Sequence, residues 1–141
     1  MPRMGMGRLI AGGLLAGLVL SGADFVISNF LLADQWQDVA RRHSVDRARM
    51  GGDAALVTML AVDFLLGFVL VFTYAAIRPR FGPGPKTAVM SGFLLWFAIT
   101  IVCAGFMAMG MFTVQAYMKT SALTLVSAIV PSLVGAAIYK E

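Results

Sequence analysis

Two aspartates interrupt long apolar stretches of this chain and are the residues best placed to do chemistry. Asp24 lies within the apolar run Leu9–Ala33, and Asp63 lies within the run Ala54–Ile77. A carboxylate at the centre of a membrane helix costs about 2.5–3.5 kcal/mol on insertion scales, so it normally faces a protein interior or a wet cavity. Two such carboxyls close together do not both ionise easily, which suits a site that binds a proton or a cation. The same pair can instead be a structural contact that fixes the register of two helices.

The spacing predicts that these aspartates meet. Each lies nine residues from the end of its apolar run that faces the first loop, which corresponds to a depth of roughly 13–14 Å. Asp24 also shares a helical face with the Gly13-x-x-x-Gly17 pair, a pattern that allows close helix approach. The nearest expected cation is Lys119 in the last helix, so the candidate proton or cation site is Asp24, Asp63 and Lys119.

A weaker candidate consists of sulfur ligands. Cys103, Met107 and Met111 are spaced i, i+4 and i+8 on one helix side, and soft sulfur ligands suit Cu(I). Methionine is also an ordinary packing residue, and ten are spread along the chain. His43 is the only histidine, which excludes a bis-histidine haem. We therefore expect no cofactor.

Two membrane aspartates are also a requirement of intramembrane aspartyl proteases. Those enzymes carry Tyr-Asp and Gly-x-Gly-Asp motifs, whereas the contexts here are Gly22-Ala23-Asp24 and Ala61-Val62-Asp63. The sequence also lacks a nucleophile–base pair and a nucleotide-binding loop. We therefore expect no enzyme activity.

The composition indicates the elements that position these residues. The chain of 141 residues is 60% hydrophobic and only 13% charged, which is typical of membrane proteins. Helices are the expected spanning structure because every backbone polar group must be satisfied inside the segment. The predicted fold is an all-α four-helix transmembrane bundle, a single domain over residues 1–141. Its helices are expected at about 8–42, 54–77, 87–110 and 114–139.

The basic residues indicate the orientation. The net charge is +4, but the Lys and Arg residues flank the apolar runs and form no stripe for nucleic acid. Counting them by loop gives a small excess on the side of the two termini, which predicts that both termini are cytoplasmic. The residues on that side are Arg3, Arg8, Arg78, Arg80, Lys86 and Lys140; the opposite side has Arg41, Arg42, Arg47, Arg49 and Lys119.

The two polar connections differ in character. In the first, Asp38 has helical spacing to Arg41, and Asp53 is the expected N-cap of the second helix. The second, residues 78–86, has three prolines and two glycines and is expected to be a stiff, non-helical turn. Its basic residues, Arg78, Arg80 and Lys86, are a candidate contact for lipid phosphate or a partner, although topology alone explains them.

The stretch Tyr74–Ala88, with the sequence YAAIRPRFGPGPKTA, resembles one in small bacterial membrane proteins that have four predicted helices and no known function. The resemblance implies the four-helix fold and a bacterial inner (cytoplasmic) membrane location. It implies no activity and no functional residue.

Two functions fit these observations. The first is a non-catalytic accessory or structural subunit that packs against itself or against larger membrane partners, with a buried Asp pair inside. The alternative is a small proton- or cation-linked transporter or channel that uses Asp24 and Asp63. Both functions imply contact with the lipid bilayer and no binding of nucleic acid.

Overall fold

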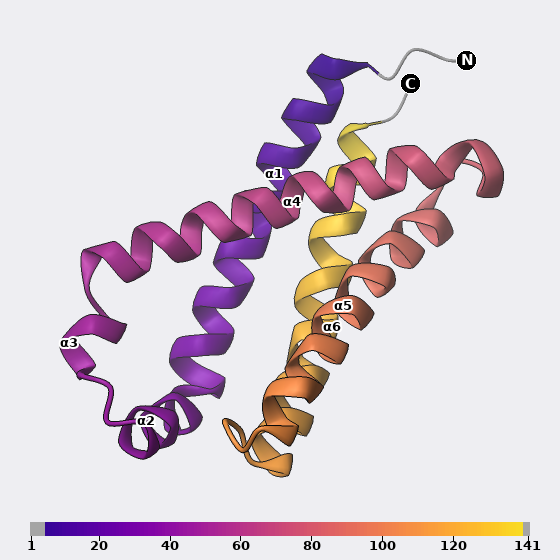
Figure 1. Ribbon diagram of the computed structural model, residues 1–141. Coiled ribbons are helices and arrows are strands. Elements are labelled where there is room, and N and C mark those ends of the chain that lie inside the picture. The colour runs from indigo at the N-terminus through magenta and orange to yellow at the C-terminus, as the bar shows by residue number, and fades with distance from the viewer. Residues whose placement is uncertain (1–4, 140–141) are drawn as a thin grey trace.

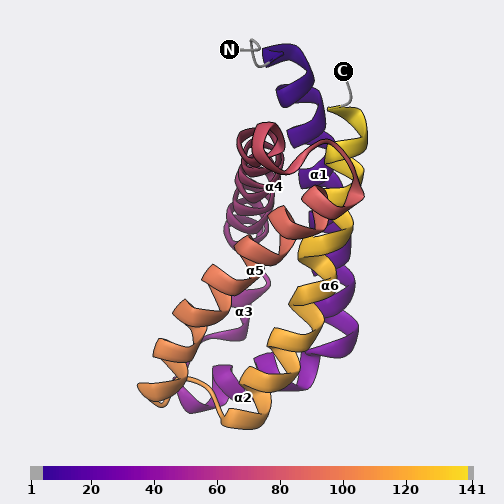
Figure 2. The ribbon, with the colours of Figure 1, turned by 90° about the vertical axis from the view of Figure 1, so that its right-hand side faces the viewer.

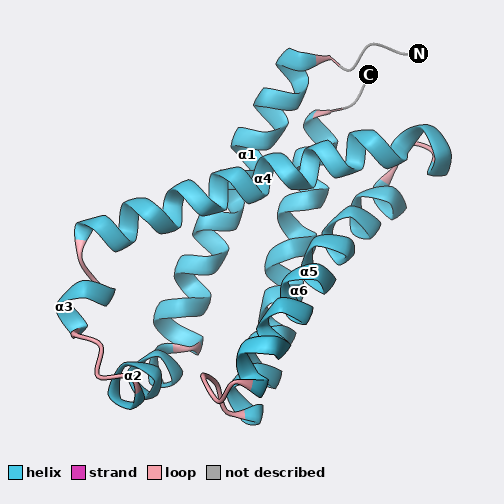
Figure 3. Cartoon of the chain, in the orientation of Figure 1, coloured by secondary structure: helices cyan, strands magenta, loops and turns pink. Residues whose placement is uncertain are grey.

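The computed structural model describes residues 5–139, apart from the side chains of Arg47 and Met50. Arg3 and Lys140, which were assigned to the terminal side of the membrane, lie outside the described residues. The described chain is helical with short connections, as Figure 3 shows. Its order is α1 (Met6–Val26), η1 (Ile27–Leu31), α2 (Ala33–Arg42), α3 (Arg47–Met50), α4 (Asp53–Phe81), α5 (Pro85–Ala108) and α6 (Val114–Ile138).

Four of these segments are long and apolar enough to cross a membrane. They are Met6–Leu31, Asp53–Phe81, Pro85–Ala108 and Val114–Ile138, and the mean hydropathy of their most apolar windows is between 1.9 and 2.5. A span needs about 20 mainly apolar residues, so each segment is sufficient. The predicted all-α fold with four transmembrane-type helices is confirmed, and the chain is a multi-pass membrane protein by helix length and hydropathy.

The four long helices pack as a bundle in which α4 is steeply inclined to α1 (Figure 1). The helices α1, α5 and α6 run more nearly along one direction, and α6 packs against both α1 and α5. The start of α1, the end of α6 and the α4–α5 turn lie at one end of the bundle. The opposite end carries the α5–α6 turn and α2, which lies across it (Figure 2).

The first helix is not continuous from residue 8 to 42 as predicted. It changes to a π-helical turn at Ile27–Leu31, and Leu32 then leaves helical geometry with φ −114° and ψ 7°. The side-chain amide of Asn29 donates to the carbonyl of Phe25 at 2.8 Å. A side chain that competes for an intrahelical carbonyl in this way loosens the i to i−4 ladder, which accounts for a break without proline or glycine.

The second connection is shorter than predicted because α4 continues through Pro79 to Phe81. Proline removes the backbone N–H that would donate to the carbonyl four residues earlier, and the helix ends only two residues later. The helix ends at Gly82, whose φ of 82° suits glycine. Asp53 is likewise the first residue of α4, and Gly52 holds the predicted N-cap position.

The predicted break between the third and fourth spans is confirmed. The helix α5 ends at Ala108, Gly110 adopts a φ of 81°, and α6 begins at Val114. The hydroxyl of Thr113 caps α6 by accepting from the backbone N–H of Ala116 at 3.1 Å. The helices α5 and α6 pack most closely where the start of α5 meets the end of α6, and they separate toward this turn (Figure 2).

Candidate functional site

The site is built around a close crossing of α1 and α4. A methyl group added at Gly67 of α4 would lie 2.6 Å from the Cα of Gly17 and 2.7 Å from the carbonyl oxygen of Gly13. Only glycine on both helices permits this approach, as expected for a small-xxx-small contact in a membrane. The crossing fixes which residues of α1 and α4 meet further along the two helices.

Asp24 and Asp63 meet just beyond this crossing. The two carboxyl groups are close enough to interact electrostatically, as expected for residues at a similar depth. The expected burial of both is wrong, because Asp63 is buried, at 9% exposed, whereas Asp24 is half-buried. The carboxyl on α1 is therefore the more open of the two.

Two serines complete the pair. The hydroxyl of Ser127 on α6 lies near Asp24, and that of Ser21 on α1 lies near Asp63 and donates to the carbonyl of Gly17 at 2.9 Å. The four side chains therefore connect three helices, α1, α4 and α6, at one level. We call Ser21, Asp24, Asp63 and Ser127 the polar lock.

A line of hydroxyl groups leads from the polar lock along α6 toward α2. Ser127 donates to the carbonyl of Thr124 at 3.2 Å, and Thr124 donates to the carbonyl of Thr120 at 2.9 Å. Thr120 in turn donates to the amide oxygen of Gln35 on α2 at 3.3 Å. A hollow of about 20 Å³ next to Gln35 and Thr120 has room for about one water molecule. Polar groups thus extend from the lock to the α2 end of the bundle.

The structure does not bring Lys119 to the aspartates. Its side chain is exposed, and the residue lies eight positions before Ser127, which is about 12 Å along α6. A lysine at that position reaches the nearby membrane surface more readily than the level of the lock. The lock therefore has two carboxyls and two hydroxyls, without the predicted cation.

The proposed sulfur ligands do not share one helix face. Cys103 and Met107 are half-buried on α5, but α5 ends at Ala108 and Met111 is exposed in the turn that follows. Met111 therefore does not lie two helical turns beyond Cys103 on the same helix. Among residues 5–139, no group of three or more His, Cys, Asp or Glu side chains is placed to hold a metal ion.

The basic residues of the second connection lie at the same end as the chain termini. The guanidinium carbon of Arg78 lies 5.9 Å from the centre of the Tyr139 ring, and that of Arg80 lies 5.9 Å from the centre of the Phe81 ring. Lys86 is exposed in the first turn of α5. Arg78 is thus part of the contact between α4 and α6, together with the edge-to-face pair of Tyr74 and Tyr139.

Several polar residues of the interior were not identified from the sequence. Ser91 donates to the carbonyl of Leu70 at 2.7 Å, Ser132 to that of Ala88 at 2.6 Å, and Trp96 to that of Ser121 at 2.8 Å. Each bond joins two different helices. Helical spacing places Ser127 near the small-residue face of α6, and this spacing is the sequence signal that could have identified it as an interior residue.

No protein-family model, curated protein or solved structure matches this chain.

Proposed function

We propose that this protein is a non-catalytic accessory subunit of a membrane complex, in which the four helices form a packing scaffold. The observation that carries the proposal is how the interior polar groups are used. Within the described residues, every buried side-chain nitrogen or oxygen has a hydrogen-bond partner. Buried groups that are satisfied by neighbouring helices hold the bundle together and leave no donor or acceptor for a substrate.

The outer surface supports a packing role. The middle and end of α5 expose large apolar side chains, among them Ile101 and Val102, which are 55% and 59% exposed. The buried residues of α5 are confined to its first two turns, at Thr87, Ala88, Ser91 and Gly92. Its remaining turns offer a free apolar surface to lipid or to the helices of a second copy or a larger partner.

Cross-linking in native membranes tests this role. In a Cys103→Ser background, Val102→Cys carries a photoreactive probe on the exposed side of α5, and Ser91→Cys carries it on the buried side. The proposal predicts protein adducts of defined mass from the Val102 position and none between chains from the Ser91 position. Adducts to lipid alone at Val102 would contradict it.

The second candidate is proton- or cation-linked transport, and the open side of Asp24 favours it. Asp24 is half-buried, and the hydroxyls of Ser127, Thr124 and Thr120 place polar groups along α6 between the pair and Gln35 at the α2 end. Proton flux into proteoliposomes compares the wild type with Asp24→Asn and Asp63→Asn. Flux that is lost in both variants would support transport, and flux that persists in both would remove the aspartates from it.

The bacterial inner membrane remains the proposed location on the resemblance of the Tyr74–Ala88 stretch to small bacterial membrane proteins. The cytoplasmic placement of both termini is likewise a proposal that rests on the distribution of Lys and Arg.

A further inference from the structure

The α2 end of the molecule has the geometry of a membrane-surface segment. The first span ends at Leu31, and after the break at Leu32 the chain turns into α2, which lies across the end of the bundle (Figure 2). Ala40 is buried against the protein, whereas Asp34, Asp38 and Arg41 are exposed. An amphipathic helix that lies across the end of a spanning bundle sits at the level of lipid headgroups.

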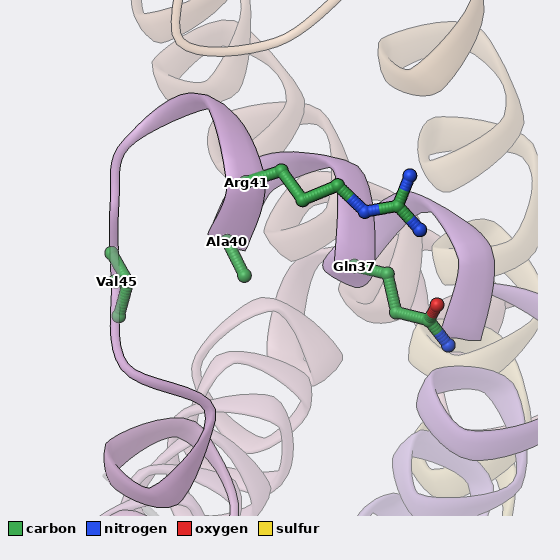
Figure 4. Close-up of a pocket in the computed structure, with 4 residues that line it drawn as sticks. All are labelled: Gln37, Ala40, Arg41 and Val45. Carbon is green, nitrogen blue, oxygen red and sulfur yellow. The ribbon is translucent and has the colours of Figure 1, made fainter.

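A hollow of about 290 Å³ lies at this level and is lined by Gln37, Ala40, Arg41 and Val45 (Figure 4). Gln37 and Arg41 are one helical turn apart, and their side chains extend along the same side of α2 with their polar ends near each other. Ala40 and Val45 add apolar surface. The volume is at the lower limit of the roughly 300–1,000 Å³ typical of small-molecule sites, which suits a headgroup rather than a whole lipid.

Arg41 is the one charged residue among those that line the hollow, which favours an anion as the ligand. The helix α2 also carries Asp34 and Asp38, and between Ala40 and Met50 the chain carries four arginines and one aspartate. That aspartate, Asp46, already accepts from the backbone N–H of Ala48 at 3.0 Å. Arg41 has only a long contact of 3.9 Å to Asp38, with both side chains largely exposed, so its forked donors are available. A guanidinium binds phosphate through paired, charge-assisted hydrogen bonds.

The neighbouring surface suits the apolar part of the same ligand. The end of the first span exposes Phe30 and Leu31, and the start of α4 exposes Leu56 and Val57, with exposed fractions between 45% and 75%. Along the chain, the first pair precedes α2 and the second pair follows α3, so both lie at the ends of the spans next to this segment. A free phosphate would leave this surface unused, whereas acyl chains would cover it.

We propose that the hollow beside α2 binds the phosphate headgroup of an anionic phospholipid through Arg41 and Gln37. The acyl chains then lie along Phe30, Leu31 and the first turns of α4. This binding anchors α2 to the membrane surface and does not depend on the role proposed for the bundle.

Native mass spectrometry of the full chain in neutral detergent tests the site with defined probes. Short-chain phosphatidylglycerol supplies the anionic phospholipid, short-chain phosphatidylcholine the zwitterionic one, and inorganic phosphate the free anion. Arg41→Gln removes the proposed phosphate ligand, and Arg42→Gln is the matched control because it removes the same charge one residue outside the hollow. Both side chains are exposed, so neither change disturbs the fold.

The wild type is expected to retain phosphatidylglycerol in preference to phosphatidylcholine. Arg41→Gln is expected to weaken this retention roughly tenfold, the loss typical of a hydrogen bond to a charged group, while Arg42→Gln changes it by less than about twofold. Equal losses in the two variants would show general surface charge and overturn the site. Equal retention of the two lipids, or retention of inorganic phosphate with the affinity of phosphatidylglycerol, would also overturn it.

Discussion

At the scale of single residues, the polar lock shows how carboxyl groups that are costly to bury can stabilise a membrane protein. Asp63 is nearly enclosed, yet its carboxyl lies close enough to Asp24 and Ser21 on α1 to interact with both. A polar side chain that finds partners on neighbouring helices stabilises the bundle, because the alternative is an unsatisfied group in hydrocarbon. The lock therefore requires hydrogen-bonding groups at this level.

The first prediction concerns Asp63. Asp63→Asn keeps the shape and supplies both a donor and an acceptor, so the free energy of unfolding in detergent should stay within about 1 kcal/mol of the wild type. Asp63→Ala removes the contacts and should destabilise the bundle by about 1–3 kcal/mol. Thermal unfolding followed by circular dichroism measures both, with the exposed Asp34→Ala as the control. If Asn were as damaging as Ala, an ionised carboxyl would be required and a structural lock would be wrong.

The aspartates were predictable from the sequence, but their surroundings were not. Apolar context and equal distance from the loop were enough to pair Asp24 with Asp63. The partner on α6 was not predictable, because which face of α6 meets α1 depends on the packing of small residues such as Gly12 against Gly135. Lys119 was the cation expected near the pair, yet Ser127, two turns further along α6, is the residue that lies near Asp24.

At the scale of elements, glycine contacts determine how the helices cross. Gly67 meets Gly13 and Gly17 at the α1–α4 crossing, and Gly92 of α5 lies against Ala128 of α6, where an added methyl would be 2.7 Å from its carbonyl oxygen. Without a hydrophobic force between helices in lipid, such close van der Waals contact is a main source of association.

The second prediction concerns this crossing. Gly67→Ala places a methyl against backbone atoms that have no room to move, and overpacking of this kind costs about 1–3 kcal/mol. Gly105→Ala is the matched control, because it lies in the last turn of α5 with no atom within 4 Å of the added methyl. The control should be neutral or stabilising by about 0.5–1 kcal/mol. Equal unfolding temperatures for the two variants would show that the crossing is not tight.

The limits of sequence reasoning at this scale lie at the helix ends. Length and hydropathy were sufficient for the four spans, and Gly110 marked the α5–α6 turn. The break at Leu32 carries no proline or glycine, since it arises from a π-helical turn beside Asn29. The extension of α4 through Pro79 was also not predictable from the sequence, because proline usually ends a helix. Here the contact of Arg78 with Tyr139 holds that turn against α6.

At the scale of the whole molecule, the arrangement of connections separates two polar ends. The α4–α5 turn lies with the start of α1 and the end of α6, whereas α2 and the α5–α6 turn lie at the opposite end (Figure 1). Any orientation in the membrane must therefore place Lys86 and Asp34 on opposite sides. The excess of Lys and Arg favours Lys86 on the cytoplasmic side.

The third prediction concerns this orientation. In a Cys103→Ser background, Asp34→Cys should react with a membrane-impermeant maleimide added to intact cells. Lys86→Cys should react only after the membrane is permeabilised. The reverse pattern would invert the orientation, and reaction of both positions from one side would contradict the four-span fold.

The central claim, that the bundle is a packing subunit of a complex, is tested most directly by its native mass after extraction in mild detergent. The chain alone has a mass of 15.0 kDa. We predict a single species whose mass equals two or more chains, or chains plus a partner in fixed stoichiometry. Val102→Arg on the exposed side of α5 should dissociate this species. A monodisperse species of 15.0 kDa for the wild type would contradict the account.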